Sequence, residues 1–438
     1  MSRPGWFRKQ QSLLVTGGAT AAKRTGRRTA KAQGALASPA AGAGASAGAP
    51  SRLRRRGAAL TATGAALVFV AGISIVAFAA PGSHAAPVPS DTPTQDQATG
   101  AFRVVSVTPT AGSHNANGAA PIWVQFSAPL SASSPLPQIS PKIPGSWQVQ
   151  GDLAVFIPTG GFFENTKVTV TVPAGPSGVI STAGATGGGT LSSAVTDTYT
   201  TGSFSTLRLQ QLLAELGYLP LTWTPKSRAV ISPGDAGAQL AAAYSAPAGT
   251  FSWQGGYPSN LKDQWKAGTG NILDDGAVRA FESVNGLTMD GDAGPAVWSD
   301  LLAAVAKGTQ NPNGYTYALA NQNLPETLTV WHNGRVVLTT AANTGITASP
   351  TVDGTYPVYL RLPFTYMKGT NPDGIPYDDP VWYVSYFNGG DAVHYFPRGS
   401  YGWNQSLGCV ELPWDQAAQA YPYLTYGSLV TVIGPVGG

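Results

Sequence analysis

The most informative stretch of the sequence is His394-Tyr-Phe-Pro-Arg-Gly-Ser-Tyr-Gly-Trp-Asn-Gln-Ser-Leu-Gly-Cys409, which holds the only cysteine of the 438-residue chain. A single thiol cannot form a disulfide within its own chain. The glycine before Cys409 lets a substrate approach the backbone closely, and the imidazole of His394 can accept the thiol proton. The stretch therefore indicates a nucleophile and its general base. The alternative is that Cys409 is a small buried apolar residue and His394 a structural histidine.

The sequence around this stretch predicts β-strands. Apolar residues recur with a period of two in runs separated by turn residues, as expected for strands with one buried face. Asn333-Gly334, between two of the runs, is typical of a two-residue hairpin turn. The runs are 328–332, 335–340, 354–362, 381–387 and 428–433. We therefore expect a mostly-β domain at 315–434, shaped as a β-sandwich, that carries Cys409.

Two further segments precede this domain. Residues 101–200 contain alternating runs at 102–107, 122–126, 153–157 and 167–172, which predict a small β-sandwich. Residues 203–306 change to helical periodicity, with a stripe of leucines from Leu207 that closes at Gly217. We expect a small α-helical domain there, with an insertion at 221–270.

The N-terminal region differs from the rest in charge. Residues 1–56 hold 12 of the 26 Lys and Arg residues and no acidic residue, which leaves 14 basic and 22 acidic residues, a net charge of −8, in the remainder. The sequence pI of about 9.0 therefore arises from the basic tail. Nothing indicates that the folded part binds nucleic acid. Residues 10–50, rich in Ala, Gly and Ser, predict a disordered basic tail at 1–56.

An apolar run from Gly57 to Ala80 follows directly after Arg52-Leu-Arg-Arg-Arg56. Its 24 residues suffice to cross about 30 Å of hydrocarbon, and the flanking positive charge places the tail in the cytoplasm. We expect a transmembrane signal anchor at 57–80, a linker at 81–100 and an extracellular remainder. The alternative is a signal peptide cleaved near residues 80–86, which would release the protein to the cell wall.

Three resemblances accompany these predictions. The order of Val330–Val337, Asn343–Gly345, Ser349–Val358, Phe387–His394 and Ser406–Leu412 resembles the L,D-transpeptidase catalytic domain, also called the YkuD fold. Ser106–Gly112 and Val124–Leu130 resemble bacterial Ig-like modules. Leu209–Leu219, Val278–Phe281, Asn285–Leu287 and Asp290–Pro295 resemble the three-helix peptidoglycan-binding domain, apart from the insertion.

The first resemblance implies an enzyme that uses a cysteine nucleophile to build peptidoglycan, and the expected anchor at 57–80 would hold it on the membrane. Cys409 would attack the stem peptide at its third residue, release D-alanine and transfer the acyl group to an amine of another stem, forming 3-3 cross-links. His394 would act as base and then as acid. We expect the backbone N–H groups of Gly408 and Cys409 to bind the oxyanion, with Ser406 in support.

The same resemblance implies the ligands. We expect Tyr386, Asn404 and Glu411 to contact the substrate, the cell-wall polymer to be the partner and carbapenem-type inhibitors to acylate the thiol. No cofactor is expected, and four scattered histidines with one cysteine give no metal-ligand pair at zinc spacing.

Two departures from the family leave other functions open. Leu407 stands where the family usually has a second histidine, and Glu411 where it usually has Arg or Asn. These replacements allow a non-enzymatic alternative, a catalytically inactive wall anchor that binds peptidoglycan. Water as the acyl acceptor would instead make the protein an L,D-carboxypeptidase.

Overall fold

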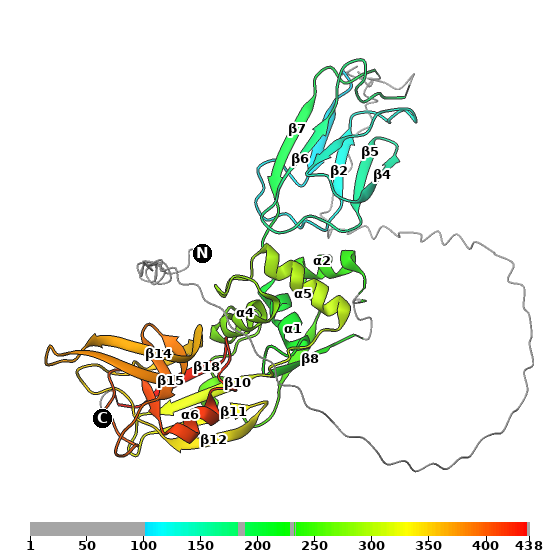
Figure 1. Cartoon of the computed structure of the whole chain (residues 1–438). Helices are drawn as coiled ribbons and strands as arrows, with labels where there is room; N and C mark the ends of the chain where they lie inside the picture. The colour runs from blue at the N-terminus through cyan, green and yellow to red at the C-terminus, as the bar shows by residue number, and fades with distance from the viewer. Residues whose placement is uncertain (1–100, 183–188, 228–231, 233, 436–438) are drawn as a thin grey trace, which may run out of the picture. The chain divides into compact units, whose positions relative to one another are not determined.

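The computed structural model describes residues 101–182, 189–227, 232 and 234–435 (Figure 1). The predictions for the basic tail, the apolar segment at 57–80 and the linker at 81–100 lie outside these residues. Within the described ranges, no helix is both long and apolar enough to cross a membrane.

The first described domain consists of strands in two antiparallel sheets. Alternating side chains of β2 and β6 are buried in one core, which confirms the predicted two-residue periodicity. One sheet has the order β1-β2-β5-β4 and the other β3-β6-β7. The strands are β1 (Val104–Thr108), β2 (Ile122–Phe126), β3 (Gln138–Ser140), β4 (Gly145–Gln150), β5 (Leu153–Pro158), β6 (Lys167–Val172) and β7 (Val195–Thr200).

A helical segment comes next in the chain. The local sequence determines where its helices begin and end. Ser205 caps α1, and Asn271 and Asp274 form a reciprocal capping box at the start of α4. The predicted stop at Gly217 is confirmed, because this residue has a left-handed φ of 77° just after α1. The main helices are α1 (Thr206–Glu215), α4 (Ile272–Asn285) and α5 (Pro295–Lys307).

The predicted insertion has structure of its own. The strands β8 (Leu221–Pro225) and β9 (Gly249–Trp253) form a two-stranded antiparallel sheet. The helix α2 (Ala236–Tyr244) lies between these strands in sequence, and the short helix α3 (Ser259–Lys262) follows them. Leu221, Leu240 and Leu261 of the insertion belong to the same apolar core as α1, α4 and α5. The insertion is therefore part of the helical domain.

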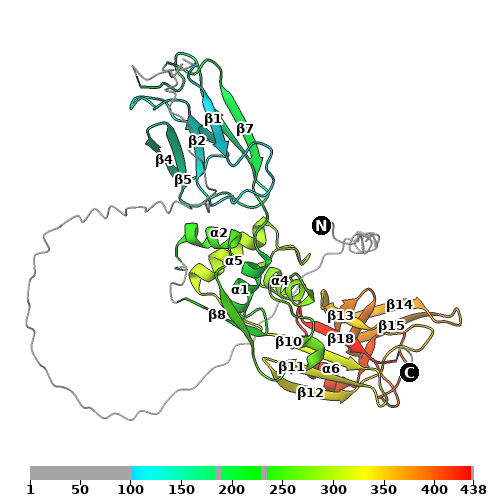
Figure 2. The ribbon, with the colours of Figure 1, turned by 180° about the vertical axis from the view of Figure 1, so that it is seen from behind.

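The C-terminal domain contains two sheets that enclose a core. The first has the order β12-β11-β10-β18-β13, and Figure 2 shows β10, β11 and β12 side by side. The Asn333-Gly334 turn between β11 and β12 has positive φ at both residues, as predicted for a two-residue hairpin. The strands of this sheet are β10 (Thr316–Asn321), β11 (Thr327–His332), β12 (Arg335–Ala341), β13 (Gly354–Pro357) and β18 (Leu429–Ile433).

The second sheet has the order β14-β15-β16-β17. Its long hairpin of β14 (Leu360–Thr370) and β15 (Pro376–Asn388) extends beyond the rest of the domain (Figure 1). The strand β16 (Asp391–Tyr395) pairs in parallel with β17 (Val410–Leu412), and the helix α6 (Trp414–Ala420) follows. Val393 and Val410 of this sheet share a core with Val330 and Val430 of the first.

The helical and C-terminal domains share part of one core. Tyr315, Tyr317 and Leu429 of the C-terminal domain are buried in the apolar cluster of the helical domain. Gly276 of α4 packs so closely on the Gly427 carbonyl that a Cβ would lie 2.6 Å from it. Full burial of a leucine such as Leu429 stabilises a fold by about 1.5–3 kcal/mol. The two domains therefore depend on each other for apolar burial.

Candidate active site

Cys409 and His394 lie on the same face of the second sheet. Cys409 directly precedes β17, and the parallel register places Val393 beside Val410 and His394 beside Glu411. Because side chains alternate across a strand, Cys409 projects to the face from which His394 projects. The fold thus brings together two residues that the sequence predicts as nucleophile and base.

The thiol of Cys409 is partly buried beneath the β14–β15 hairpin. Its Sγ lies 3.9 Å from Sδ of Met367 on β14 and 3.9 Å from the Gly390 carbonyl oxygen. Burial raises the pKa of the Cys409 thiol to about 12, and the nearby carboxylates of Asp391 and Glu411 act in the same direction. The thiol is therefore protonated at neutral pH in this state and needs a base to become a nucleophile.

The imidazole of His394 has the protonation state that a base needs. The side chain is 2% exposed, and this burial lowers its pKa, so the ring is neutral at pH 7. Nδ1 lies 2.9 Å from the Tyr395 carbonyl oxygen, which can only accept a hydrogen bond, so Nδ1 carries the proton. Nε2 is left as the basic nitrogen. Among the described residues, no hydrogen bond joins this ring to the Cys409 thiol.

Ser406 fixes the loop that carries the nucleophile. Its buried hydroxyl donates to the Cys409 carbonyl oxygen at 2.6 Å and accepts from the Gly408 N–H at 3.3 Å. These two bonds hold the backbone of the loop around Cys409. Gly408 has a φ of 110°, and a Cβ there would lie 2.3 Å from Oδ1 of Asp391. Only glycine fits this position without strain.

Glu411 is buried and forms an ion pair with the partly exposed Arg398. Arg398 donates from Nε and Nη2 to the two carboxylate oxygens of Glu411, both at 2.7 Å, and Asn343 donates to Oε2 at 3.2 Å. Glu411 is 4% exposed, so the guanidinium neutralises a carboxylate that would be costly to bury alone. The departure from the family at this position is thus accompanied by a cation on the neighbouring loop.

The other sequence-predicted residues lie in two places. Tyr386, on β15, is partly buried. This burial is the main cause that raises its pKa to about 12, and the proximity of Cys409 is the second. Burial also raises the pKa of Tyr359 and of Tyr377, and the proximity of Cys409 acts in the same direction on both. Asn404 is partly buried in the loop between β16 and β17. Contact of Tyr386, Asn404 and Glu411 with a substrate remains a prediction.

Sequence reasoning missed two neighbours of the thiol. Met367 lies 42 residues before Cys409 and reaches it only because the β14–β15 hairpin folds over the site. No local sequence pattern therefore predicts this contact. Asp391 could have been noticed as an acidic residue three positions before His394, shortly after the predicted strand at 381–387. Its carboxylate lies against Gly408, and burial raises its pKa to about 7.

Asp391 leads to a prediction of pH dependence. Its folded pKa of about 7 lies above the ordinary value of 3.8, so the carboxyl favours the folded state at low pH, and this contribution is lost as the pH rises from about 4 to about 7. Asp391→Asn should therefore raise Tm at pH 8 by about 2–4 °C, the effect of ~1 kcal/mol in a domain of this size, but change it little at about pH 4. Calorimetry at both pH values measures this, and equal Tm differences at the low and the high pH would refute it.

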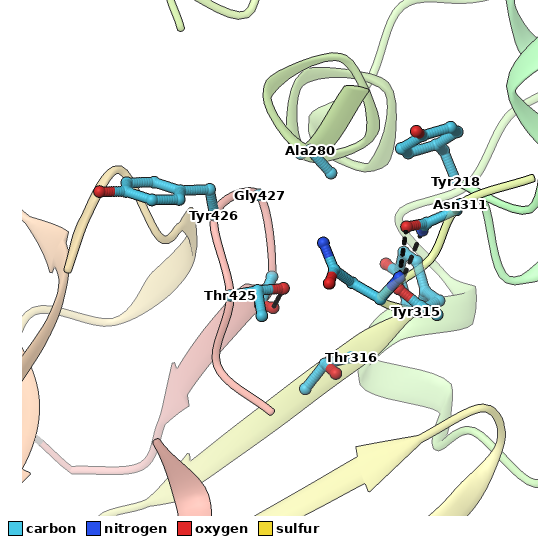
Figure 3. Close-up of a pocket in the computed structure, with 12 residues that line it drawn as sticks. Tyr218, Ala280, Asn311, Tyr315, Thr316, Thr425, Tyr426 and Gly427 are labelled. Carbon is cyan, nitrogen blue, oxygen red and sulfur yellow. Dashed lines mark hydrogen bonds between the residues drawn. The ribbon is translucent and has the colours of Figure 1, made fainter. Parts of the chain in front are cut away.

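A pocket lies elsewhere in the described structure. It is formed where α4 meets the C-terminal domain, and Figure 3 shows Ala280 above, with Thr425, Tyr426 and Gly427 on the left. Asn311 and Tyr315 also line it. None of its lining residues is a candidate catalytic residue, so this pocket does not define the active site.

Comparisons with known proteins agree with the fold. The family model of the L,D-transpeptidase catalytic domain matches residues 316–432, and that of the bacterial Ig-like domain matches residues 98–206. No curated protein matches the chain. The helices between these two ranges lie outside both matches, so their likeness to a peptidoglycan-binding domain remains a prediction.

Several solved structures of L,D-transpeptidases are also similar. An L,D-transpeptidase from Mycobacterium smegmatis is 15% identical, with 76% of this chain and 99% of that chain covered and a TM-score of 0.26. The catalytic domain of the Enterococcus faecium enzyme is 26% identical over 27% of this chain and 96% of its own, with a TM-score of 0.25. An L,D-transpeptidase from Stackebrandtia nassauensis is 22% identical over 40% and 86%, with a TM-score of 0.23.

The matched ranges coincide with the two β domains described above. Residues 316–432, which carry the partly buried thiol and the neutral imidazole, therefore belong to the L,D-transpeptidase catalytic domain family, and a bacterial Ig-like domain precedes them in the chain.

Proposed function

We propose that the protein is a cysteine L,D-transpeptidase that forms 3-3 cross-links between peptidoglycan stem peptides. The observation that carries the proposal is the placement of Cys409 and His394 on one face of two adjacent parallel strands, within a domain of this family. The neutral ring, whose Nδ1 proton is held by the Tyr395 carbonyl, presents Nε2 as the base.

The reaction follows from these groups in two steps. Nε2 of His394 takes the proton of Cys409, and the thiolate attacks the carbonyl carbon of the third stem residue. The C–N bond to D-alanine breaks, the leaving amine takes the proton from the imidazolium, and a thioester remains. An amine of a second stem then attacks the thioester, its proton passes to His394, and the thiol is released.

The oxyanion of each step needs backbone donors. We propose the N–H groups of Gly408 and Cys409 for this role, because Ser406 holds their loop in place. The Gly408 N–H makes a long bond of 3.3 Å to the Ser406 hydroxyl, which a substrate carbonyl can replace. Such a donor typically contributes ~3–4 kcal/mol to transition-state stabilisation.

The experiment that tests the function uses the exported chain and purified disaccharide-tetrapeptides. A transpeptidase produces dimers that have lost one D-alanine, detected by mass. Release of D-alanine with only tripeptide monomers would identify water as the acceptor and a carboxypeptidase. No change in substrate under conditions that keep the protein folded would refute both enzymatic functions and favour a wall anchor.

We further propose that the helical segment at 203–306 holds the enzyme on the wall. The support is the order of its motifs, which resembles peptidoglycan-binding domains. Binding would raise the effective concentration of stems at Cys409 without changing the chemical step.

We also propose that residues 57–80 anchor the chain in the cytoplasmic membrane, with the catalytic domain outside. If so, the mature protein keeps its basic tail and stays in the membrane fraction after a high-salt wash, because a spanning helix is held by hydrocarbon and not by charge. Fractionation and N-terminal sequencing measure this. A mature N-terminus between residues 80 and 86 would show cleavage and contradict the anchor.

A further inference from the structure

The sheet that carries the active site has a continuous row of aromatic rings on its other face. Phe364 of β14 packs on Trp382 of β15 at 5.0 Å between ring centroids, Trp382 on Tyr395 of β16 at 6.1 Å, and Tyr395 on Trp414 of α6 at 4.8 Å. Tyr366 extends the row along β14, 5.2 Å from Phe364. We call these five residues the ring face.

The strand register places the ring face opposite the thiol. Phe364 is paired with Trp382, and Tyr366 with Pro380, whereas Met367 is paired with Asp379. Since side chains alternate, Met367 and the rings project to opposite sides of the hairpin. Met367 contacts Cys409, so the rings lie on the side that the reaction does not use.

The ring face is open to solvent where the hairpin extends beyond the core. Phe364, Tyr366 and Trp414 are 41%, 55% and 42% exposed. Isolated exposed apolar residues need no explanation, but a contiguous exposed patch commonly marks a binding surface. This patch is also firmly supported, because Tyr395 and Trp382 beneath it are only partly exposed and fix the orientation of the outer rings.

The charges beside the ring face indicate an uncharged partner. Lys368 and Asp378 form an ion pair at 2.8 Å on the same side of the hairpin. The guanidinium of Arg361 stacks on the ring of Tyr421 at 4.2 Å and donates to its carbonyl oxygen. Neither cation is therefore free to attract phosphates, anionic lipid or the carboxylates of a peptide.

We propose that the ring face binds the glycan strands of the cell wall by stacking on their sugar rings. A sugar ring has an apolar face of C–H groups that packs on an aromatic face, and hydroxyl groups at its rim that remain in water or bond to neighbours such as the Tyr366 hydroxyl. An uncharged, extended polymer of such rings matches a neutral row of aromatic side chains. The occupant is therefore the polysaccharide, which is chemically distinct from the stem peptide that Cys409 is proposed to attack.

This inference goes beyond the proposed reaction and does not require Cys409 to be active. It gives the catalytic domain its own affinity for the wall, in addition to any affinity of the helical domain. The β14–β15 hairpin then joins two functions, since one side covers the thiol and the other holds the polymer.

The experiment compares variants of the exported chain in binding to stem-free glycan strands. The test variants are Phe364→Ala with Tyr366→Ala, and Trp414→Ala alone. The matched control is Trp123→Ala in the Ig-like domain, because Trp123 and Trp414 are equally exposed at 42%. Sedimentation with insoluble strands and fluorescence titration with N-acetylglucosamine oligosaccharides measure binding, and carbapenem acylation of Cys409 reports that the site is intact.

The double variant should bind about 5- to 150-fold more weakly, the loss that corresponds to two aromatic contacts of about 0.5–1.5 kcal/mol each. Trp123→Ala should bind like the wild type, and Tyr366→Phe, which keeps the ring, should retain most of the affinity. Unchanged binding by the double variant, or an equal loss in Trp123→Ala, would overturn the proposal. The proposal would also be overturned if the variants changed self-association in ultracentrifugation, or binding to phosphatidylglycerol vesicles, but left glycan binding the same. A wild-type protein that binds glycan but is not acylated would refute the proposed enzyme and leave this inference standing.

Discussion

Cys409→Ala should abolish both the covalent carbapenem adduct and the cross-linking of tetrapeptides. The thiol is the sole cysteine of the chain, so no second thiol can replace it. Loss of a covalent nucleophile removes the acyl-enzyme itself, and the expected effect is a reduction to the background rate, ~10⁴-fold or more. Intact mass after incubation with a carbapenem measures the adduct, and product mass measures cross-linking.

Cys409→Ser provides the matched control for this experiment. Serine keeps the size and the hydrogen-bonding capacity of the side chain but is a far weaker nucleophile, so acylation should be lost while the fold stays intact. Thermal unfolding of both variants reports the fold. An adduct of the same mass on Cys409→Ala and on the wild type, or an adduct on neither, would remove Cys409 from the mechanism.

His394→Ala should slow acylation by ~10²–10⁴-fold, the usual effect of removing a general base. The physical reason is the thiol pKa of about 12 in the resting site, which leaves almost no thiolate at neutral pH without a base. The residual rate of the variant should rise steeply with pH, because hydroxide would then have to remove the proton. Stopped-flow measurement of acylation from pH 6 to 9 gives both the rate and its pH dependence.

His394→Asn is a useful companion, because its amide nitrogen can take the place of Nδ1 and donate to the Tyr395 carbonyl, but it has no basic nitrogen. If either variant kept the wild-type rate and pH profile, another group would have to activate the thiol. Arg398 is a poor substitute, since its charge is neutralised by Glu411.

Local patterns predicted most of the fold correctly. The two-residue periodicity of the β runs, the Asn333-Gly334 turn and the helix stop at Gly217 depend only on neighbours in sequence, and all three are confirmed. His394 and Cys409 could be paired because they lie at the two ends of one connected stretch.

The rest of the site depends on contacts between distant segments. Met367 reaches the thiol through the long hairpin, and Arg398 meets Glu411 because their loops converge. Glu411 alone looked like a charge inversion, since the sequence gives no sign of which cation lies beside it. The aromatic residues of the ring face are scattered over 51 positions of sequence, from Phe364 to Trp414, and form a row only in the folded sheet.

The core shared by the helical and catalytic domains restricts how this enzyme can be dissected. Cutting the chain before Tyr315 would leave Tyr315, Tyr317 and Leu429 without the helices that cover them, and would break the bond from the Gly334 N–H to the Tyr257 hydroxyl. A catalytic fragment that starts at residue 315 should therefore aggregate or lose activity for reasons unrelated to wall binding. The smallest reliable expression unit starts near residue 203, and the contribution of the helices to wall affinity has to be measured with surface substitutions in a chain that keeps them.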